Sequence, residues 1–198
     1  MDAVSAALLA AYASLGLELW LLAVPSEAST ASMLAARAAS RPRHVLLHSA
    51  CGALTVTLLS LPLLVTLWPP LRDGLGRLAF LERAPLRVAG VALALGGRAL
   101  SIVSLLQLRA RRGAAAGVLG MQTRGLYARS RNPVLLGMFA FHAGCCLVYP
   151  SVVLILGSLP YAWHMHRRVL LEEGHLSSVL GAPYREYLGR VPRYLRIL

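Results

Sequence analysis

Charged residues of both signs gather directly after the last apolar run of the chain. Arg167 and Arg168 are followed by Glu172 and Glu173, and residues four apart lie on the same side of a helix. Guanidinium and carboxylate groups together suit a polar ligand that carries both signs of charge. The same pattern is also typical of an ordinary solvated helix face, and composition alone favours that second interpretation.

The sequence gives little support for a metal site or for a serine nucleophile. His44 and His48 lie one helical turn apart, and His164 and His166 lie near the end of the last apolar run, but no third ligand stands at a useful spacing. We therefore predict no metal site. We also find no serine nucleophile motif. Three cysteines lie in apolar segments without C-x-x-C spacing, which predicts buried free thiols rather than disulfides: Cys51, Cys145 and Cys146.

The composition is typical of a protein whose solvent is the bilayer. Hydrophobic residues make up 57% of the 198 residues, and only 14% are charged; a soluble domain of this length has no core large enough for so much apolar side chain. The net charge is +12, yet the arginines flank long apolar runs. Basic residues in that place indicate membrane topology and anionic lipid headgroups. We therefore predict a lipid bilayer and no nucleic acid as partner.

The apolar runs predict an all-α, polytopic membrane protein of about five transmembrane helices. The spans expected from length are Val4–Val24, His44–Trp68 and Leu86–Leu108, followed by a longer run over Pro133–His166. A proline in the middle of this last run, in Tyr149-Pro150-Ser151, disfavours a continuous helix. We expect two short helices in a hairpin there. The first run has no basic segment before it, so we interpret it as a retained span rather than a signal peptide.

Small residues on the two helices of this hairpin predict their packing. Gly137, Ala140 and Gly144 recur on the first helix, and Gly157 lies on the second. Small residues let two membrane helices approach closely. We therefore expect these residues to bring the two hairpin helices together.

The arginines predict the orientation in the membrane. One side of the bilayer would carry Arg37, Arg41, Arg43, Arg109, Arg111, Arg112, Arg124, Arg129, Arg131, Arg167, Arg168, Arg185, Arg190, Arg193 and Arg196. The other side would carry only Arg72, Arg77, Arg83 and Arg87. The positive-inside rule then places the N-terminus outside and the C-terminal tail in the cytoplasm.

Two charges fall within the expected spans. Glu18 lies in the first span and Arg98 near the middle of the third. An unpaired charge inside a bilayer is costly. We predict an ion pair between these two residues, with a structural role.

Two strings flank the hairpin and resemble a known family. The first is T-R-G-L-Y-A-R-S-R-N-P-V-L-L-G at residues 123–137. It resembles the G-x-Y-x-x-x-R-[HN]-P-x-Y-x-G element of the isoprenylcysteine carboxyl methyltransferases and the related phospholipid methyltransferases. The second resembles that family's E-E-x-x-L-x-x-x-F-G-x-x-Y-x-x-Y-x-x-x-V-x-R tail and comprises Glu172, Glu173, Leu176, Leu180, Gly181, Tyr184, Tyr187, Val191 and Arg193.

The resemblance implies methyl transfer from S-adenosylmethionine, on the cytoplasmic side, to a lipophilic acceptor that stays in the bilayer. It implies catalytic roles for Arg131, Arg168 and Glu172, with Arg168 also binding the substrate. It implies that the cofactor is bound by Leu119, Gly120, Met121, Gln122, Tyr127, Asn132, Pro133, Val134, Leu135 and Glu172. A guanidinium at Arg168 suits a carboxylate acceptor, because paired hydrogen bonds orient it.

Three positions depart from the family pattern. Leu135 replaces an aromatic residue of the cofactor motif, and we expect the missing hydroxyl to affect either cofactor binding or substrate preference. Leu180 replaces a phenylalanine, which we interpret as a neutral packing change. Asn132 stands where histidine is commoner, a variant associated with bacterial members of the group.

These observations divide the chain into two parts of one membrane domain, 1–198. Residues 1–108 would form a three-helix scaffold and residues 109–198 the methyltransferase-like part. The expected acceptor is a carboxylate of the isoprenylcysteine type. The alternatives are a phospholipid amine N-methyltransferase, a membrane sterol reductase, and a non-catalytic scaffold or transporter of the same fold. The compact length favours a bacterial inner membrane, with the active site facing the cytoplasm.

Overall fold

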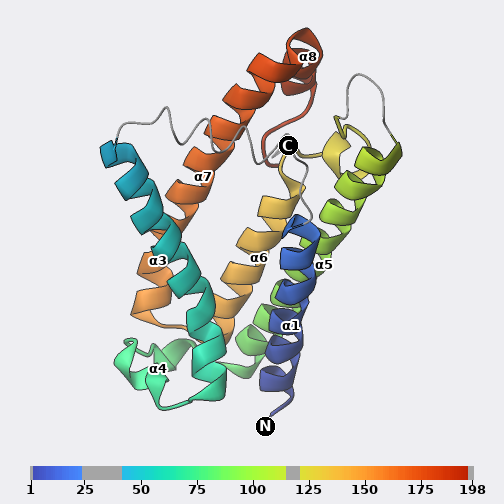
Figure 1. Cartoon of the computed structure of the whole chain (residues 1–198). Coiled ribbons are helices and arrows are strands. Elements are labelled where there is room, and N and C mark those ends of the chain that lie inside the picture. The colour runs from blue at the N-terminus through green and yellow to red at the C-terminus, as the bar shows by residue number, and fades with distance from the viewer. Residues whose placement is uncertain (1, 24–41, 115–120, 196–198) are drawn as a thin grey trace.

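In a computed structural model, the chain is helical throughout the part that the structure describes, which comprises residues 2–23, 42–114 and 121–195 (Figure 1). The long helices are α1 (Ala3–Ala23), α3 (Pro42–Leu67), α5 (Ala84–Ala114), α6 (Pro133–Val148) and α7 (Val152–Leu180). The short ones are α4 (Leu71–Gly74), η1 (Ala79–Leu81), η2 (Gly125–Ala128) and α8 (Ala182–Arg190). The prediction of an all-α fold is confirmed.

The helices follow the predicted runs, with two extensions. The hairpin is confirmed, since α6 ends at Val148 and α7 begins at Val152. The N-terminus of α7 is capped by the hydroxyl of Ser151, which accepts a hydrogen bond from the backbone N–H of Leu154 at 3.3 Å. However, α7 continues to Leu180 and α5 to Ala114, well beyond the expected ends. The charged tail is therefore a continuation of the last long helix.

The closest helix pair in the described structure is α5 with α6, and glycines make the approach possible. A Cβ atom on Gly97 would lie 2.5 Å from the carbonyl oxygen of Gly137, and one on Gly90 would lie 2.7 Å from that of Gly144. No side chain fits at such distances. The predicted partner of Gly137, Ala140 and Gly144 was therefore wrong, because this face of α6 packs on α5 rather than on α7.

The second helix of the hairpin packs elsewhere. A Cβ on Gly157 would meet the side chain of Leu58, so the small residue of α7 faces α3. Figure 1 shows α3 and α7 on one side of the bundle, with α1, α5 and α6 on the other. Thus α6 packs on α5 and α7 packs on α3. A groove lies between α6 and α7. Helix periodicity does not tell which neighbour a small face will meet.

The two ends of the bundle differ in construction. At one end, the backbone of the segment after α4 bonds to the α6–α7 connection: Leu78 N–H donates to the Pro150 carbonyl at 2.9 Å, and Val152 N–H to that of Gly76 at 2.9 Å. At the opposite end, η2 contacts the C-terminal part of α5, where the Leu126 N–H donates to the Gln107 side chain at 3.0 Å, and α8 follows the C-terminal end of α7 (Figure 1). Residues 121–132 and 181–195 share this second end, where the Tyr187 hydroxyl donates to the Tyr127 carbonyl at 2.7 Å.

The largest hydrophobic core combines both predicted parts of the chain. Leu8 and Val65 come from the first part, and Phe141, Cys145 and Leu154 from the second, and all are buried together. The subdivision at residue 108 stays a prediction about function, since packing joins the two parts.

One helix of the described residues is long and apolar enough to cross a membrane, the stretch Ala84–Ala110 of α5. Three shorter apolar stretches accompany it: Ala3–Leu15, Ala53–Leu67 and Pro133–Val148. Helices occupy the expected runs, and the crossing of a bilayer by any of them remains a prediction.

Candidate functional site

Glu173 on α7 is the carboxylate at which the two motif strings meet. Its residue is only 8% exposed. Its Oε1 lies 3.1 Å from a terminal nitrogen of Arg131, and Arg193 donates to its Oε2 from a terminal nitrogen at 2.7 Å and from Nε at 3.1 Å. Because a buried charge is tolerated when it is paired and hydrogen-bonded, this arrangement joins one loop residue and one tail residue to α7. We call Arg131, Glu173 and Arg193 the carboxylate clamp.

Backbone hydrogen bonds continue the contact between the loop and the tail. The Arg131 N–H donates to the Pro192 carbonyl at 3.0 Å, and the Arg131 guanidinium donates to the Leu188 carbonyl at 2.8 Å. The carbonyl of Arg193 accepts from the Asn132 side-chain amide at 3.2 Å. The side chain of Asn132, predicted to bind the cofactor, therefore holds the tail in this structure.

A tyrosine cluster packs beneath these bonds. Tyr184, Tyr187 and Val191 are buried together, with Met121 against them. The Tyr187 hydroxyl donates to the carbonyl of Tyr127 at 2.7 Å. Burial raises the pKa of Tyr184 to about 12, and it raises the pKa of Tyr187 further above the usual tyrosine value. Both hydroxyls are therefore protonated at neutral pH, and Tyr187 keeps its role as a donor.

Arg168 and Glu172 lie on a different face of α7 from Glu173. Both are exposed, whereas Val169 and Glu173 are buried. Successive residues of a helix are about 100° apart around its axis. Arg168 is therefore exposed although Val169 is buried, and Glu172 is exposed although Glu173 is buried. Within the described part of the chain, neither Arg168 nor Glu172 forms an ion pair. The two opposite charges are thus accessible to a ligand, one turn apart.

The structure separates the predicted cofactor residues into two groups. Met121 and Gln122 are half-buried in the loop, and the Gln122 amide donates to the Arg124 carbonyl at 3.3 Å. Tyr127 is buried in η2. Leu119 and Gly120 lie outside the described residues. This group is the part of the loop that lies against α8.

The other group begins α6. Pro133 is the first residue of the helix, where a missing N–H costs nothing. The Val134 carbonyl accepts a hydrogen bond from Ser101 of α5 at 3.0 Å. Leu135 is buried against Tyr161 and neighbouring residues of α7. Its side chain therefore points into the apolar core, where the replacement of an aromatic residue changes packing. A direct contact between Leu135 and the cofactor remains a prediction.

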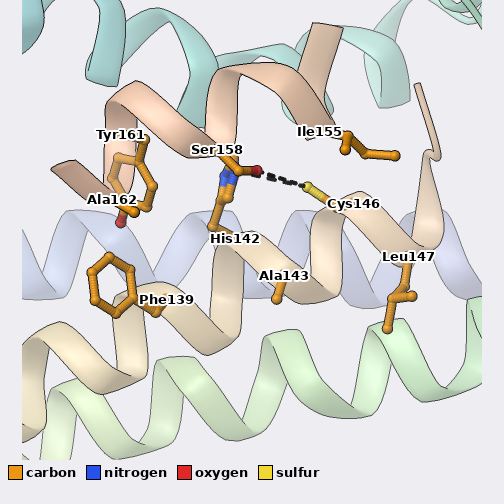
Figure 2. A pocket seen from close by; sticks show the side chains of 9 residues that line it. All are labelled: Phe139, His142, Ala143, Cys146, Leu147, Ile155, Ser158, Tyr161 and Ala162. Carbon is orange, nitrogen blue, oxygen red and sulfur yellow. Dashed lines mark hydrogen bonds between the residues drawn. The ribbon is translucent and has the colours of Figure 1, made fainter. Parts of the chain in front are cut away.

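An apolar groove of about 430 Å³ lies between α6 and α7 (Figure 2). It contains one polar cluster: His142 Nε2 lies 2.9 Å from the Ser158 hydroxyl, and the Cys146 thiol lies 3.7 Å from His142 Nε2 and 3.8 Å from Ser158 Oγ. We did not predict this cluster. The sequence signal that could have indicated it is His142, a histidine in the middle of an apolar run.

Of the predicted Glu18–Arg98 ion pair, the structure describes the side chain of Arg98. Arg98 is buried, its Nε donates to the Ser14 hydroxyl at 2.9 Å, and its guanidinium lies over the ring of Phe141 at 5.6 Å from the centroid. The side chain of Glu18 lies outside the described residues. The contact with Ser14 places Arg98 against α1, the helix that carries Glu18.

No set of three or more histidine, cysteine, aspartate or glutamate side chains in the described residues has the geometry of a metal site. No family model, curated protein or solved structure matches this chain. The case for a function therefore depends on the chemistry of the two strings and on where the fold places them.

Proposed function

We propose that this chain is an integral membrane methyltransferase that uses S-adenosylmethionine and methylates a lipophilic acceptor, most simply a carboxylate of the isoprenylcysteine type. The observation that carries the proposal is the convergence of the two strings on Glu173. Each string resembles an element of the isoprenylcysteine carboxyl methyltransferases, and they are distant in sequence. The carboxylate clamp, the Tyr187–Tyr127 bond and the Asn132–Arg193 bond bring them to one end of the bundle.

Membrane insertion is part of the same proposal. Support comes from the apolar length of α5 and from large apolar side chains on the outer faces of several helices, which soluble proteins rarely expose together: Val56, Leu67, Val88, Leu106, Leu156 and Leu159. The basic end of the bundle, which holds the two strings, would face the cytoplasm of a bacterial cell. The opposite end carries Trp68 and Phe80, exposed as interfacial anchors are.

The residues on the polar end fit a cofactor that carries a carboxylate, an amine and a sulfonium. Glu172 offers a carboxylate and Arg168 a guanidinium, and both are exposed and without an ion pair in the described chain. Met121, Gln122 and Tyr127 would line the neighbouring loop. The cofactor supplies an electrophilic methyl group when bound. Glu172 would attract its cationic groups, and Arg168 would orient the acceptor carboxylate by paired hydrogen bonds.

The chain's contribution to the reaction would be placement. A carboxylate acceptor is already a nucleophile at neutral pH, so no side chain needs to remove a proton. Methyl transfer proceeds in line, so the rate depends on holding the acceptor oxygen opposite the sulfur and on keeping water out. The half-buried Arg131 contacts Glu173 and the tail. We therefore assign Arg131 a positioning role rather than the catalytic role implied by the resemblance.

The test uses the purified full chain in lipid nanodiscs. We expect binding of S-adenosylhomocysteine, and transfer of a labelled methyl group to a farnesylcysteine analogue. Glu172→Gln should weaken S-adenosylhomocysteine binding at least tenfold, and Arg168→Ala should chiefly raise the KM of the acceptor. Arg185→Ala, which removes an exposed arginine of α8, is the control and should change neither.

The assay also separates the alternatives. Methylation of phosphatidylethanolamine but not of the carboxylate would favour an amine N-methyltransferase. Absence of S-adenosylhomocysteine binding in the wild-type protein would overturn the enzyme proposal and favour a scaffold or transporter.

A further inference from the structure

The polar cluster in the groove has a definite hydrogen-bond order. Ser158 has one hydroxyl proton, and its oxygen lies 2.9 Å from the Leu154 carbonyl, to which it donates. The 2.9 Å contact between Ser158 and His142 must then run from the Nε2–H of the imidazole to the hydroxyl oxygen. This tautomer leaves Nδ1 of His142 as an acceptor, and this atom is buried without a hydrogen-bond partner in the described chain. His142 as a whole is 4% exposed.

The cluster does more than join two helices. A hydrogen bond between polar side chains commonly connects membrane helices, but such a contact normally sits in a packed interface. Here it borders an open groove that is otherwise lined mostly by apolar residues, among them Phe139, Leu147 and Ile155 (Figure 2). The half-buried Cys146 thiol adds a further weak donor on the same side. Ser158 retains a lone pair, and Nδ1 of His142 has an unused one.

A plain acyl chain of the bilayer matches only part of this lining. It would fill the apolar surface but offer no partner to the remaining lone pair of Ser158 or to the Cys146 thiol. A hydrocarbon chain that bears a hydroxyl fits the apolar surface and also offers a partner to these two groups. The hydroxyl can donate to the free lone pair of Ser158 and accept from the Cys146 thiol, while the chain on either side lies against the apolar residues.

The depth of the cluster relates it to the polar end of the bundle. His142 lies ten residues after Asn132 on α6, and Ser158 lies ten residues before Arg168 on α7. At 1.5 Å per residue, both helices place the cluster about 15 Å from the polar end. Two independent helices agree on this separation. A ligand with its carboxylate at Arg168 would therefore reach the cluster with the middle or lower part of its chain.

We propose that the groove between α6 and α7 binds the hydrocarbon chain of the acceptor and prefers a chain that carries a hydroxyl, which Ser158, ordered by His142, recognises. The inference rests on the proposed methyltransferase function for the position of the carboxylate. Phe139 and Tyr161 pack edge to face, with ring centroids 5.7 Å apart, and Phe139 contacts Tyr194 of the tail. Phe139 and Tyr161 therefore line the end of the groove that lies nearer the polar site (Figure 2).

The groove contains its own reporter, because Cys146 lines it. The experiment measures the rate of Cys146 alkylation by a membrane-permeable maleimide in the full chain in phosphatidylcholine nanodiscs, with Cys146→Ala to subtract the other thiols. The probes are octadecanoic acid and 12-hydroxyoctadecanoic acid, which differ only by one hydroxyl partway along the chain. Methyl transfer to both acids and S-adenosylhomocysteine binding are measured separately.

We expect the hydroxy acid to protect Cys146 at a roughly fivefold lower concentration than the plain acid, as one hydrogen bond provides. Ser158→Ala should make the two acids equal while leaving S-adenosylhomocysteine binding intact. Ala143→Phe, which fills the groove and keeps the His142–Ser158 bond, should remove protection by both acids. This second variant controls for any loss of folding through Ser158.

Equal protection by the two acids in the wild-type protein, or none by either, would overturn the inference. Neither result depends on methyl transfer. A protein that binds S-adenosylhomocysteine and shows equal protection retains the proposed function and loses the inference. Selective protection without S-adenosylhomocysteine binding would retain the hydroxyl-binding groove and overturn the methyltransferase proposal.

Discussion

The carboxylate of Glu173 on α7 lies 3.1 Å from the guanidinium of Arg131, which lies two residues before the start of α6. The same carboxylate also binds Arg193 of the tail. One acidic side chain therefore pairs with two basic ones at the end of the bundle where both motif strings lie. Glu173 therefore holds the loop and the tail together through its ion pairs, whereas its neighbour Glu172 forms no ion pair within the described residues.

The two adjacent glutamates should have separable effects. Glu173→Gln removes the charge that Arg131 and Arg193 share, and Arg131 already has a buried Nε without a partner in the described chain. We expect the free energy of unfolding to fall by about 2 kcal/mol, less than for a fully buried pair because Arg193 is partly exposed. Glu172→Gln should stay within about 0.5 kcal/mol of the wild type and instead weaken S-adenosylhomocysteine binding. Denaturant unfolding in micelles and ligand titration measure the two effects.

The reverse pattern would contradict this assignment. Should Glu172→Gln unfold the protein and Glu173→Gln alter only binding, the buried and exposed roles would have been exchanged.

Adjacent glycines of α5 should differ as sharply. Gly97→Ala places a Cβ 2.5 Å from the Gly137 carbonyl and from the Phe141 backbone nitrogen, so α5 and α6 must separate. We expect a loss of about 1–3 kcal/mol, as for overpacked cores. Gly96→Ala meets no atom within 4 Å and gains helix propensity, so it should be neutral or slightly stabilising. Thermal unfolding of the two variants side by side is the measurement, and equal melting temperatures would contradict the close packing.

Tyr187 should contribute stability that alkaline pH removes. Burial raises the pKa of its hydroxyl above the usual tyrosine value. The unfolded chain therefore loses the proton first, and the free energy of unfolding should decline as pH rises above about 10. Tyr187→Phe removes the bond to Tyr127, should cost about 1 kcal/mol at neutral pH, and should flatten this decline.

Tyr184→Phe is the matched control at neutral pH, because the Tyr184 hydroxyl forms no side-chain hydrogen bond among the described residues. A cost as large as that of Tyr187→Phe would show that ring packing, not the hydroxyl, stabilises the loop.

Acid should weaken the opposite end of the bundle. A bidentate hydrogen bond from Arg77, with the added charge of Arg72 at 2.7 Å, holds the pKa of Glu82 below its usual range. This carboxylate therefore stabilises the folded state above about pH 4, and the contribution is lost as pH falls through the lowered pKa. Glu82→Gln should be less stable at neutral pH and should have a flatter acid limb in an unfolding series.

Glu186→Gln on α8 removes an exposed carboxylate whose ion pair with Arg190 is 3.6 Å long, and it serves as the control for that series. An acid limb unchanged in Glu82→Gln would mean that the ion pairs around Glu82 do not couple to folding.

Local features of the chain determined much of this protein. Apolar run lengths predicted the long helices, and Pro150 predicted the break between α6 and α7, because a proline restricts the residue before it wherever it occurs. Residue types also identified the two strings that carry the functional proposal.

Only the tertiary structure decided which faces meet. Glu172 and Glu173 are equivalent as letters, but a rotation of about 100° makes one a solvent-facing charge and the other the centre of the clamp. The glycines of α6 predicted a closely packed neighbour but did not identify it as α5. No local sequence feature indicated that His142 would contact Ser158. The physical reason is the same in each case. Helix formation depends on neighbours along the chain, whereas burial and pairing depend on which helix, distant in sequence, packs against a given helix face.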